Sequence, residues 1–165
     1  MPSIDNATMA ISASWWVPIS LTDSESRKFS LNDTLPVVWL SPRKPSVELV
    51  GPKGSSSWVL VNLELNSYYR VNYDRTNWDL ISEQLLRDYT FFPFITRAQL
   101  IDDAFTLGHA KVITYDVALS LVRYLSNTND DILVRRMVKN HIEYIEITGE
   151  NSIKNSEKEV CQNIF

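Results

Sequence analysis

The chain has 165 residues, of which 44% are hydrophobic and 22% are charged, a composition that suits one or two small globular domains rather than a disordered chain. The formal net charge is −4, and the longest basic cluster is Arg135-Arg136 with nearby Lys139, so we expect no nucleic-acid partner. The single cysteine, Cys161, cannot form an internal disulfide and has no Cys/His cluster beside it that could bind zinc.

Residues 1–14 are expected to form an irregular N-terminus. They contain no basic region followed by an apolar run, and no stretch of the chain approaches the roughly 20 apolar residues of a membrane span. These features suit a soluble cytoplasmic chain, whereas two glycosylation sequons, Asn6-Ala7-Thr8 and Asn32-Asp33-Thr34, suit a secreted one. The sequence therefore leaves the compartment open.

Residues 15–74 have short apolar runs separated by Pro, Gly, Ser and Asn, a pattern typical of β-structure. The candidate strands are Trp15–Leu21, Val37–Leu40, Ser46–Val50, Trp58–Leu65 and Tyr68–Tyr73. In Trp58–Leu65, alternate residues form a consistently apolar face that requires a partner sheet. We predict a partial β-sandwich domain over residues 15–74.

Helical spacing of apolar residues predicts four helices within residues 75–147. The first follows Thr76-Asn77, and the second begins at a capping box of Thr96 and Gln99. The third is capped by Thr114, and the fourth begins near Asn129. The apolar residues at these spacings are Trp78, Ile81, Leu85 and Tyr89; Leu100, Ala104, Leu107 and Ala110; Ala118, Leu121, Val122 and Leu125; and Ile132, Leu133, Met137 and Ile145.

Short links between these helices require antiparallel neighbours, so the second half of the chain is predicted to form helical hairpins that resemble an α-solenoid. No repeat of fixed period supports this, and the prediction depends on helix and loop lengths. The expected fold class is α+β by segregation, a partial β-sandwich followed by helices. Residues 148–165 are predicted to be a polar tail.

Three segments, in this order, carry a resemblance to a known family: Trp16-Val17-Pro18-Ile19, Tyr68–Asp74 with Trp78 four residues on, and Arg97–Ala104. With Tyr115, Ala118, Leu119 and Tyr124-Leu125, the resemblance covers residues 15 to 130. The chain resembles the region that follows the catalytic domain in zinc aminopeptidases of the aminopeptidase N family, which includes the puromycin-sensitive and ER aminopeptidases. The motif residues that we expect to have structural roles are Tyr69, Arg70, Asn72, Tyr73, Asp74, Trp78, Arg97, Gln99, Asp102 and Asp103.

The resemblance implies a definite place for this chain. In the family an N-terminal β domain precedes a thermolysin-like zinc domain, a small β-sandwich and a large helical domain, so this chain corresponds to part of the sandwich and the start of the helical domain. Zinc catalysis there uses H-E-x-x-H with a distal Glu, together with Gly-x-Met-Glu-Asn. Neither motif is present, because His141-Ile142-Glu143-Tyr144-Ile145 lacks the second histidine. We expect no catalytic, cofactor-binding or metal-binding residue in this chain; the zinc belongs to the missing catalytic domain.

Adjacent Asp102 and Asp103 invite a paired-carboxylate mechanism, but neighbouring residues on a helix point about 100° apart. We prefer hydrogen bonding of these acids to the preceding segment. Arg70 and Asp74 lie on the last predicted strand and the turn beyond it. For them we expect a buried structural ion pair or a helix cap at the sandwich–helix junction rather than ligand binding.

Tyr68, Tyr69 and Tyr73 could form a carbohydrate-stacking set. Strand alternation would instead place Tyr69 and Tyr73 on one face with Val71, which favours packing. His109, near a helix end, is interpreted as a favourable terminal charge rather than a metal ligand. The five tryptophans are interpreted as core and domain-junction residues.

Three positions depart from the family pattern. Ser67 stands where a glycine usually precedes the Tyr-Tyr-Arg run, and Lys111 stands where a glycine usually ends the second helix. We expect Lys111 to end that helix less cleanly, since glycine relieves left-handed strain. The acidic and aromatic stretch that usually follows the third helix is reduced to Asn127–Asp131.

The sequence therefore predicts a non-catalytic region of an aminopeptidase, which would line the peptide-access chamber and fix the catalytic domain. The expected partners are that missing domain, or further copies of the chain through exposed apolar faces; peptides would bind only in the full-length context. The alternative is a free-standing interaction protein that uses the sandwich edge or the helical surface.

Overall fold

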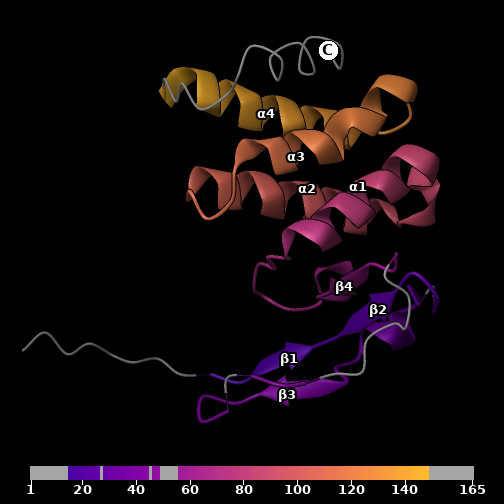
Figure 1. Ribbon diagram of the computed structural model, residues 1–165, viewed down its shortest axis with the longest axis vertical. Coiled ribbons are helices and arrows are strands. Elements are labelled where there is room, and N and C mark those ends of the chain that lie inside the picture. The colour runs from indigo at the N-terminus through magenta and orange to yellow at the C-terminus, as the bar shows by residue number, and fades with distance from the viewer. Residues whose placement is uncertain (1–14, 27, 45, 49–55, 149–165) are drawn as a thin grey trace, which may run out of the picture.

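The computed structural model describes residues 15–26, 28–44, 46–48 and 56–148 (Figure 1). Its elements are stacked along the long axis of the molecule, with β1 and β3 at one end, β2 and β4 next, and then the four α-helices, of which α4 is outermost (Figure 1). The α+β fold class is confirmed. The predictions for residues 1–14 and 149–165, and for the second half of the strand Ser46–Val50, lie outside the described residues.

The β-structure consists of two short antiparallel pairs. β1 (Val17–Ile19) pairs with β3 (Val38–Leu40), and β2 (Leu21–Asp23) pairs with β4 (Val59–Val61). The predicted strand Trp15–Leu21 is divided at Ser20, whose buried hydroxyl accepts a hydrogen bond from the backbone N–H of Leu63 at 3.0 Å. Residues 46–48, the described part of the third predicted strand, are not extended into a ladder.

The predicted strand Trp58–Leu65 ends early because its backbone turns. Asn62, Glu64 and Leu65 have φ values of 61°, 56° and 54°, in the left-handed region, and a 3-10 turn, η2 (Leu63–Leu65), replaces the second half of the strand. The expected partner sheet is also wrong. Trp58 and Leu60, both 2% exposed, form the buried side of β4, and Trp58 packs edge-on against aromatic rings of the helical part.

The strand predicted at Tyr68–Tyr73 is absent. This segment is fixed by side chains instead of a strand ladder: Asn62, which is fully buried, donates through Nδ2 to the carbonyls of Ser67 and Tyr69 at 2.9 and 3.0 Å and accepts from Ser67 N–H. The strand prediction is therefore wrong, because the backbone groups of this segment are satisfied by the Asn62 side chain and not by a neighbouring strand.

The first helix begins directly after Asp74, which confirms the predicted helix cap at the sandwich–helix junction, whereas the second begins before its predicted capping box. α1 (Arg75–Asp88) is capped by Asp74, whose carboxylate accepts from Asn77 N–H at 2.9 Å. α2 (Phe94–His109) begins directly after Pro93, which lacks an N–H and fits before a first helical turn. The capping box of Thr96 and Gln99 is wrong, because both residues lie inside α2.

The last two helices begin within three residues of their predicted starting points. α3 (Tyr115–Val122) has Thr114 at its N-cap position, although the threonine hydroxyl donates to the Asp116 carboxylate rather than capping the backbone. α4 (Ile132–Thr148) begins three residues after Asn129, with the carbonyl of Asp131 accepting its first bond. Short 3-10 turns follow α1 and α3: η3 (Tyr89–Phe91) and η4 (Arg123–Asn127); η1 (Leu31–Thr34) lies among the strands.

One continuous core joins the helices to β4. It contains residues predicted from helical spacing, with α2 packed against α3 and α4, and α1 against α3. Of the predicted apolar positions, Ala110, Ile132 and Leu133 are exposed instead. The fully buried side chains include Trp78, Ile81, Leu85, Phe92, Ile101, Phe105, Leu121, Tyr124 and Leu125. None of the described helices is long and apolar enough to cross a membrane.

The C-terminus of α2 ends regularly in spite of Lys111. The N–H of Val112 bonds to the carbonyl of Leu107, and the N–H of Lys111 to that of Gly108, both at 2.9 Å, which is the Schellman arrangement. The cost is a left-handed Lys111 with φ 58°. The expectation of a poorly ended helix is thus wrong in its hydrogen bonds, although the unfavourable φ is real.

Candidate functional site

The motif residues meet where the strands give way to the helices. Arg70 donates from Nη1 to Asp102 Oδ2 at 2.7 Å and to Asp103 Oδ1 at 2.9 Å. The second oxygen of Asp103 accepts from the backbone N–H of Val71 at 3.2 Å. The predicted bonding of the two acids to the preceding segment is confirmed, and one guanidinium clamps the extended segment onto α2.

The pKa values of the two adjacent carboxyl groups are shifted in opposite directions. The hydrogen bond from His141, together with that from Arg70, lowers the pKa of Asp102 to about 2 against the effect of burial. For Asp103, which is 5% exposed, burial raises the pKa even though Val71 and Arg70 both favour the charged form. The two carboxylates share the donor Arg70, and each has one further donor, His141 for Asp102 and Val71 N–H for Asp103, so the pair is a structural clamp rather than a shared-proton site.

The remaining residues of the tyrosine-rich motif connect β4 to α1. Tyr73 Oη accepts from Val61 N–H at 3.0 Å, and burial raises the pKa of this phenol. The Tyr73 ring packs edge-on against Trp78 at 4.8 Å, and Trp78 Nε1 donates to Asn72 at 3.2 Å. Tyr73 therefore has a packing role, as strand alternation favoured, and is not part of a carbohydrate-stacking set.

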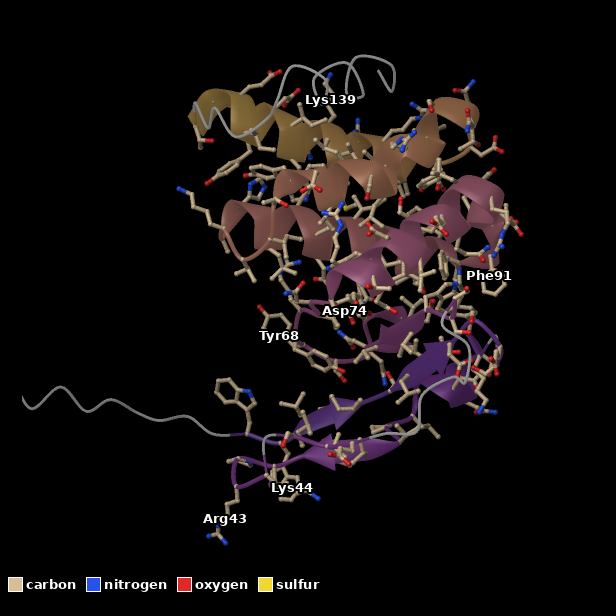
Figure 2. The ribbon with its side chains drawn as sticks, in the orientation of Figure 1. Arg43, Lys44, Tyr68, Asp74, Phe91 and Lys139 are labelled. Atoms are coloured by element: carbon tan, nitrogen blue, oxygen red, sulfur yellow. The ribbon has the colours of Figure 1, made fainter. Side chains whose placement is uncertain are left out.

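A pocket of about 820 Å³ opens beside the clamp, between residues 65–70, one side of α2 and Met137 of α4. Tyr68, which Figure 2 labels at the level between strands and helices, is fully exposed at its edge. Tyr69 is half-buried; its Oη has no hydrogen-bond partner among the described residues, and burial raises its pKa to about 12. Gln99 reaches the Val61 carbonyl at 3.4 Å from the pocket wall.

A second ion pair lies deeper in the helical part. Arg97 Nε and Nη2 donate to the two oxygens of Asp131 at 2.8 and 2.5 Å, and Arg97 Nη1 donates to the carbonyl of Phe92 at 2.6 Å. Tyr124 also donates to Asp131, at 2.6 Å. This partner is missing from the sequence-based prediction, which interprets Asn127–Asp131 as a reduced family motif at the start of the fourth helix and not as a source of a buried charge. The signal available was an acid directly before an amphipathic helix.

With this geometry established, comparison with known proteins decides the family. The family model described as ERAP1-like C-terminal domain matches residues 58–165. The chain belongs to this family. The match crosses the predicted boundary at residue 74 and includes residues 148–165; the domain boundaries remain predictions.

Several of the similar curated proteins are aminopeptidases. Human (Homo sapiens) aminopeptidase Q is 37% identical over 136 residues, which are 81% of this chain and 13% of that protein. Aminopeptidase N of Plutella xylostella is 34% identical over 131 residues (78% and 14%), and human aminopeptidase N is 38% identical over 112 residues (67% and 11%). The chain therefore spans only about a seventh or less of the length of each of these relatives.

The residues described here do not fit the catalytic zinc of such enzymes. His109 lies on α2 and His141 on α4, whereas the zinc motif needs two histidines on one helix. Their facing nitrogens hydrogen-bond to each other at 3.1 Å. In the described part of the chain no three His, Cys, Asp or Glu side chains are grouped as metal ligands. The interpretation of His109 as only a terminal charge is incomplete, since it bonds to two other helices.

Three of the five tryptophans are not in the core. Trp58 and Trp78 are buried as expected, but Trp15, Trp16 and Trp39 are 69%, 61% and 53% exposed. Leu35 and Val37 are likewise 64% and 61% exposed, and we refer to these five exposed apolar side chains around β1 and β3 as the tryptophan surface. A core position is thus confirmed for Trp58 and Trp78 and wrong for the other three tryptophans, whose expected role at a domain junction stays a prediction.

Proposed function

We propose that this chain is a non-catalytic structural part of a zinc aminopeptidase, which joins the β-structure to the helical region and lines part of the peptide chamber. The observation that supports this is the clamp of Arg70 on Asp102 and Asp103 beside an 820 Å³ pocket. A guanidinium held by two carboxylates from a different element fixes the relative position of the two parts. In this proposal the pocket is a wall of the chamber, and peptides reach it only in the full enzyme.

The proposal places the chemistry outside this chain. Zinc, when bound in the catalytic domain, would supply the Lewis-acid chemistry of peptide hydrolysis. The residues of this chain contribute position only: Asp74 begins α1, Asn77 bridges Val59, and Arg70 holds α2. We accordingly propose that the chain by itself binds no catalytic zinc and hydrolyses no peptide.

The partner that we propose for the tryptophan surface is the catalytic domain of the same enzyme. Trp15, Trp16 and Trp39 expose large apolar areas that a folded protein normally covers. Large apolar side chains of this kind are typical of the centre of a permanent interface. Self-association through the same surface is the alternative outcome when that domain is missing.

The direct test is an aminopeptidase assay of the purified chain on a panel of amino-acid amides with zinc added, beside metal analysis of the same sample. We expect no turnover and no stoichiometric zinc. Chelator-sensitive turnover with one bound zinc would contradict the proposal.

The structural role is tested separately in human aminopeptidase N, which is 38% identical over 112 residues. Its matching segment is replaced by that of this chain, with and without Arg70→Ala. The unaltered replacement should keep peptide hydrolysis, and Arg70→Ala should lower the melting temperature of the chimera, whereas exposed Arg43→Ala, the matched control, should not. Equal melting temperatures for both variants would refute the role of the clamp.

The second candidate function is a free-standing interaction protein, and the exposed Trp39 is the observation that favours it. Analytical ultracentrifugation separates the two cases. Concentration-dependent association that Trp39→Ser abolishes supports the uncovered interface of an enzyme part. A monomer that binds one defined protein tightly at high salt supports the second function.

A further inference from the structure

The two histidines of the chain lie in a row of hydrogen bonds that crosses three helices. Asp102 Oδ1 of α2 is 3.0 Å from His141 Nε2 of α4; His141 Nδ1 is 3.1 Å from His109 Nε2 of α2; and His109 Nδ1 is 2.8 Å from Tyr115 Oη of α3. Phe105 stacks on the His141 ring at 4.9 Å with an angle of 6° between the planes. The row is therefore built into the helix interfaces rather than lying loosely on the surface.

We propose that this row is a proton-responsive latch: it holds α4 against α2 while at most one of the two histidines is protonated, and it opens when both are. The inference concerns the helical part alone and does not depend on any enzymatic role.

With both histidines neutral, every donor in the row has one acceptor. Tyr115 O–H donates to His109 Nδ1, His109 Nε2–H donates to His141 Nδ1, and His141 Nε2–H donates to the Asp102 carboxylate. The tautomer of each histidine is set by its neighbour, because the carboxylate can only accept. All protons point toward Asp102.

One added proton reverses part of the row without breaking it. His141 then carries a proton on both nitrogens, so Nε2–H stays on Asp102 while Nδ1–H donates to His109 Nε2. His109 moves its own proton to Nδ1 and donates to the Tyr115 oxygen. All three bonds persist, and the new charge lies against a carboxylate.

A second proton cannot be accommodated. His109 Nε2–H and His141 Nδ1–H would then face each other at a contact of 3.1 Å with no acceptor between them. Two positive rings would also lie with their centroids 5.3 Å apart at a site where the His141 side chain is only 16% exposed. Separation of α4 from α2 is the way to relieve this.

The charged and titratable groups that face the pair in the described part of the chain come from four elements: Asp102 of α2, Tyr115 of α3, Tyr144 of α4, whose ring is 4.6 Å from that of His109, and Arg70 of the segment before α1, which reaches the row through Asp102. At the His141 end of the row, Asp102 accepts from His141 through Oδ1 and from Arg70 through Oδ2. A charge on His141 would therefore have a carboxylate oxygen beside it, whereas the contact between the two histidine nitrogens contains no acceptor once both carry a hydrogen.

The latch is connected to the pocket beside the clamp. Asp102 lines that pocket, and so does Met137, which lies one helical turn before His141 on α4. Release of α4 would thus alter one wall of the pocket and leave the Arg70–Asp103 bond in place.

The test is a titration of the full chain from pH 8 to 4.5 in EDTA, followed by NMR of the imidazole nitrogens and by amide hydrogen exchange. We expect two separate protonation steps, with tautomer exchange of His109 at the first. Protection of the α4 amides should stay constant through the first step and fall about tenfold or more at the second, because the like charges meet there. The α1 amides, which contact neither histidine, are the internal control.

His109→Gln removes the second charge and keeps an amide that can donate or accept, so α4 protection should no longer change at low pH. His141→Gln should behave alike, and it replaces the first variant if that one does not fold. Independent titration of the two wild-type histidines in one common step, or loss of α4 protection at the same pH in the glutamine variant, would overturn the proposal. So would a fall in α1 protection equal to that in α4.

Discussion

The buried pair of Arg97 and Asp131 makes the sharpest stability prediction. The Arg97 side chain is 10% exposed and that of Asp131 is 4% exposed, and two short bonds join them in a fork. Asp131→Asn keeps the size of the side chain but removes its charge. The guanidinium is then left in the interior with neutral acceptors alone: the amide oxygen of the new asparagine, the carbonyl of Phe92 and, more weakly, the carbonyl of Tyr89.

The expected loss is about 3–5 kcal/mol in the free energy of unfolding, the range found when one partner of a buried ion pair is removed. Replacing both partners with apolar residues, Arg97→Met with Asp131→Leu, should cost less than Asp131→Asn alone, because no uncompensated charge is then buried. The reason is that burial of the charge, and not the attraction itself, makes up most of the effect.

Urea unfolding of the full chain, followed by tryptophan fluorescence, measures these free energies. The matched control is Asp130→Asn, an exposed neighbour that accepts one bond from Tyr89 at 3.2 Å and should cost less than about 1 kcal/mol. If the free energy of unfolding of Asp131→Asn lies within about 1 kcal/mol of the wild-type value, water reaches Arg97 and the argument from burial is refuted.

The remaining predictions concern one turn and one acid. Lys111→Gly should stabilise the chain by about 0.5–1 kcal/mol in urea unfolding, since φ is 58° at this position; an unchanged midpoint would show that lysine is unstrained there. Gly108→Ala should destabilise by about 1–3 kcal/mol, because an added Cβ would lie 2.8 Å from two Tyr115 ring atoms, and near-equal stability would mean that the ring moves freely. The pKa of Asp102 is lowered to about 2 by the bond from His141 and a nearby guanidinium, so its stabilising effect is present above about pH 4 and is lost as the pH falls toward 2. This carboxylate is 37% exposed, so the effect is of order 1 kcal/mol, and Asp102→Asn should flatten the unfolding midpoint over that range; an equally steep acid loss in the variant would place its cause elsewhere.

The helices could be predicted from the sequence because their information is local. Trp78, Ile81 and Leu85 recur on one face of α1 and are all buried. Strand lengths could not be predicted this way, since β4 is ended by the left-handed backbone of Asn62, a conformation that the alternation of side chains does not report. The same residue supplies the hydrogen bonds that a neighbouring strand would have made to residues 67–69.

The two kinds of side-chain contact differ in how far the sequence reveals them. Asp102 and Asp103 stood out as adjacent acids in one motif segment, so their hydrogen bonding to the preceding segment could be expected, although Arg70 could not be named as the donor. Arg97 and Asp131 are 34 residues apart, and nothing in the local pattern links them. Contacts of this kind are decided by the packing of α2 on α4, which periodicity predicts only as a face and not as a pair.

The departures from the family pattern show why a missing glycine has to be judged from its backbone. Ser67 and Lys111 both replace a usual glycine, but only Lys111 has a positive φ. Ser67 is held in an ordinary conformation by its bond to Asn62, so a glycine there would only increase the freedom of the unfolded chain. Ser67→Gly should therefore weaken the fold slightly, whereas Lys111→Gly strengthens it. Opposite signs for two substitutions of the same type would locate the strain in the helix end and not in the motif.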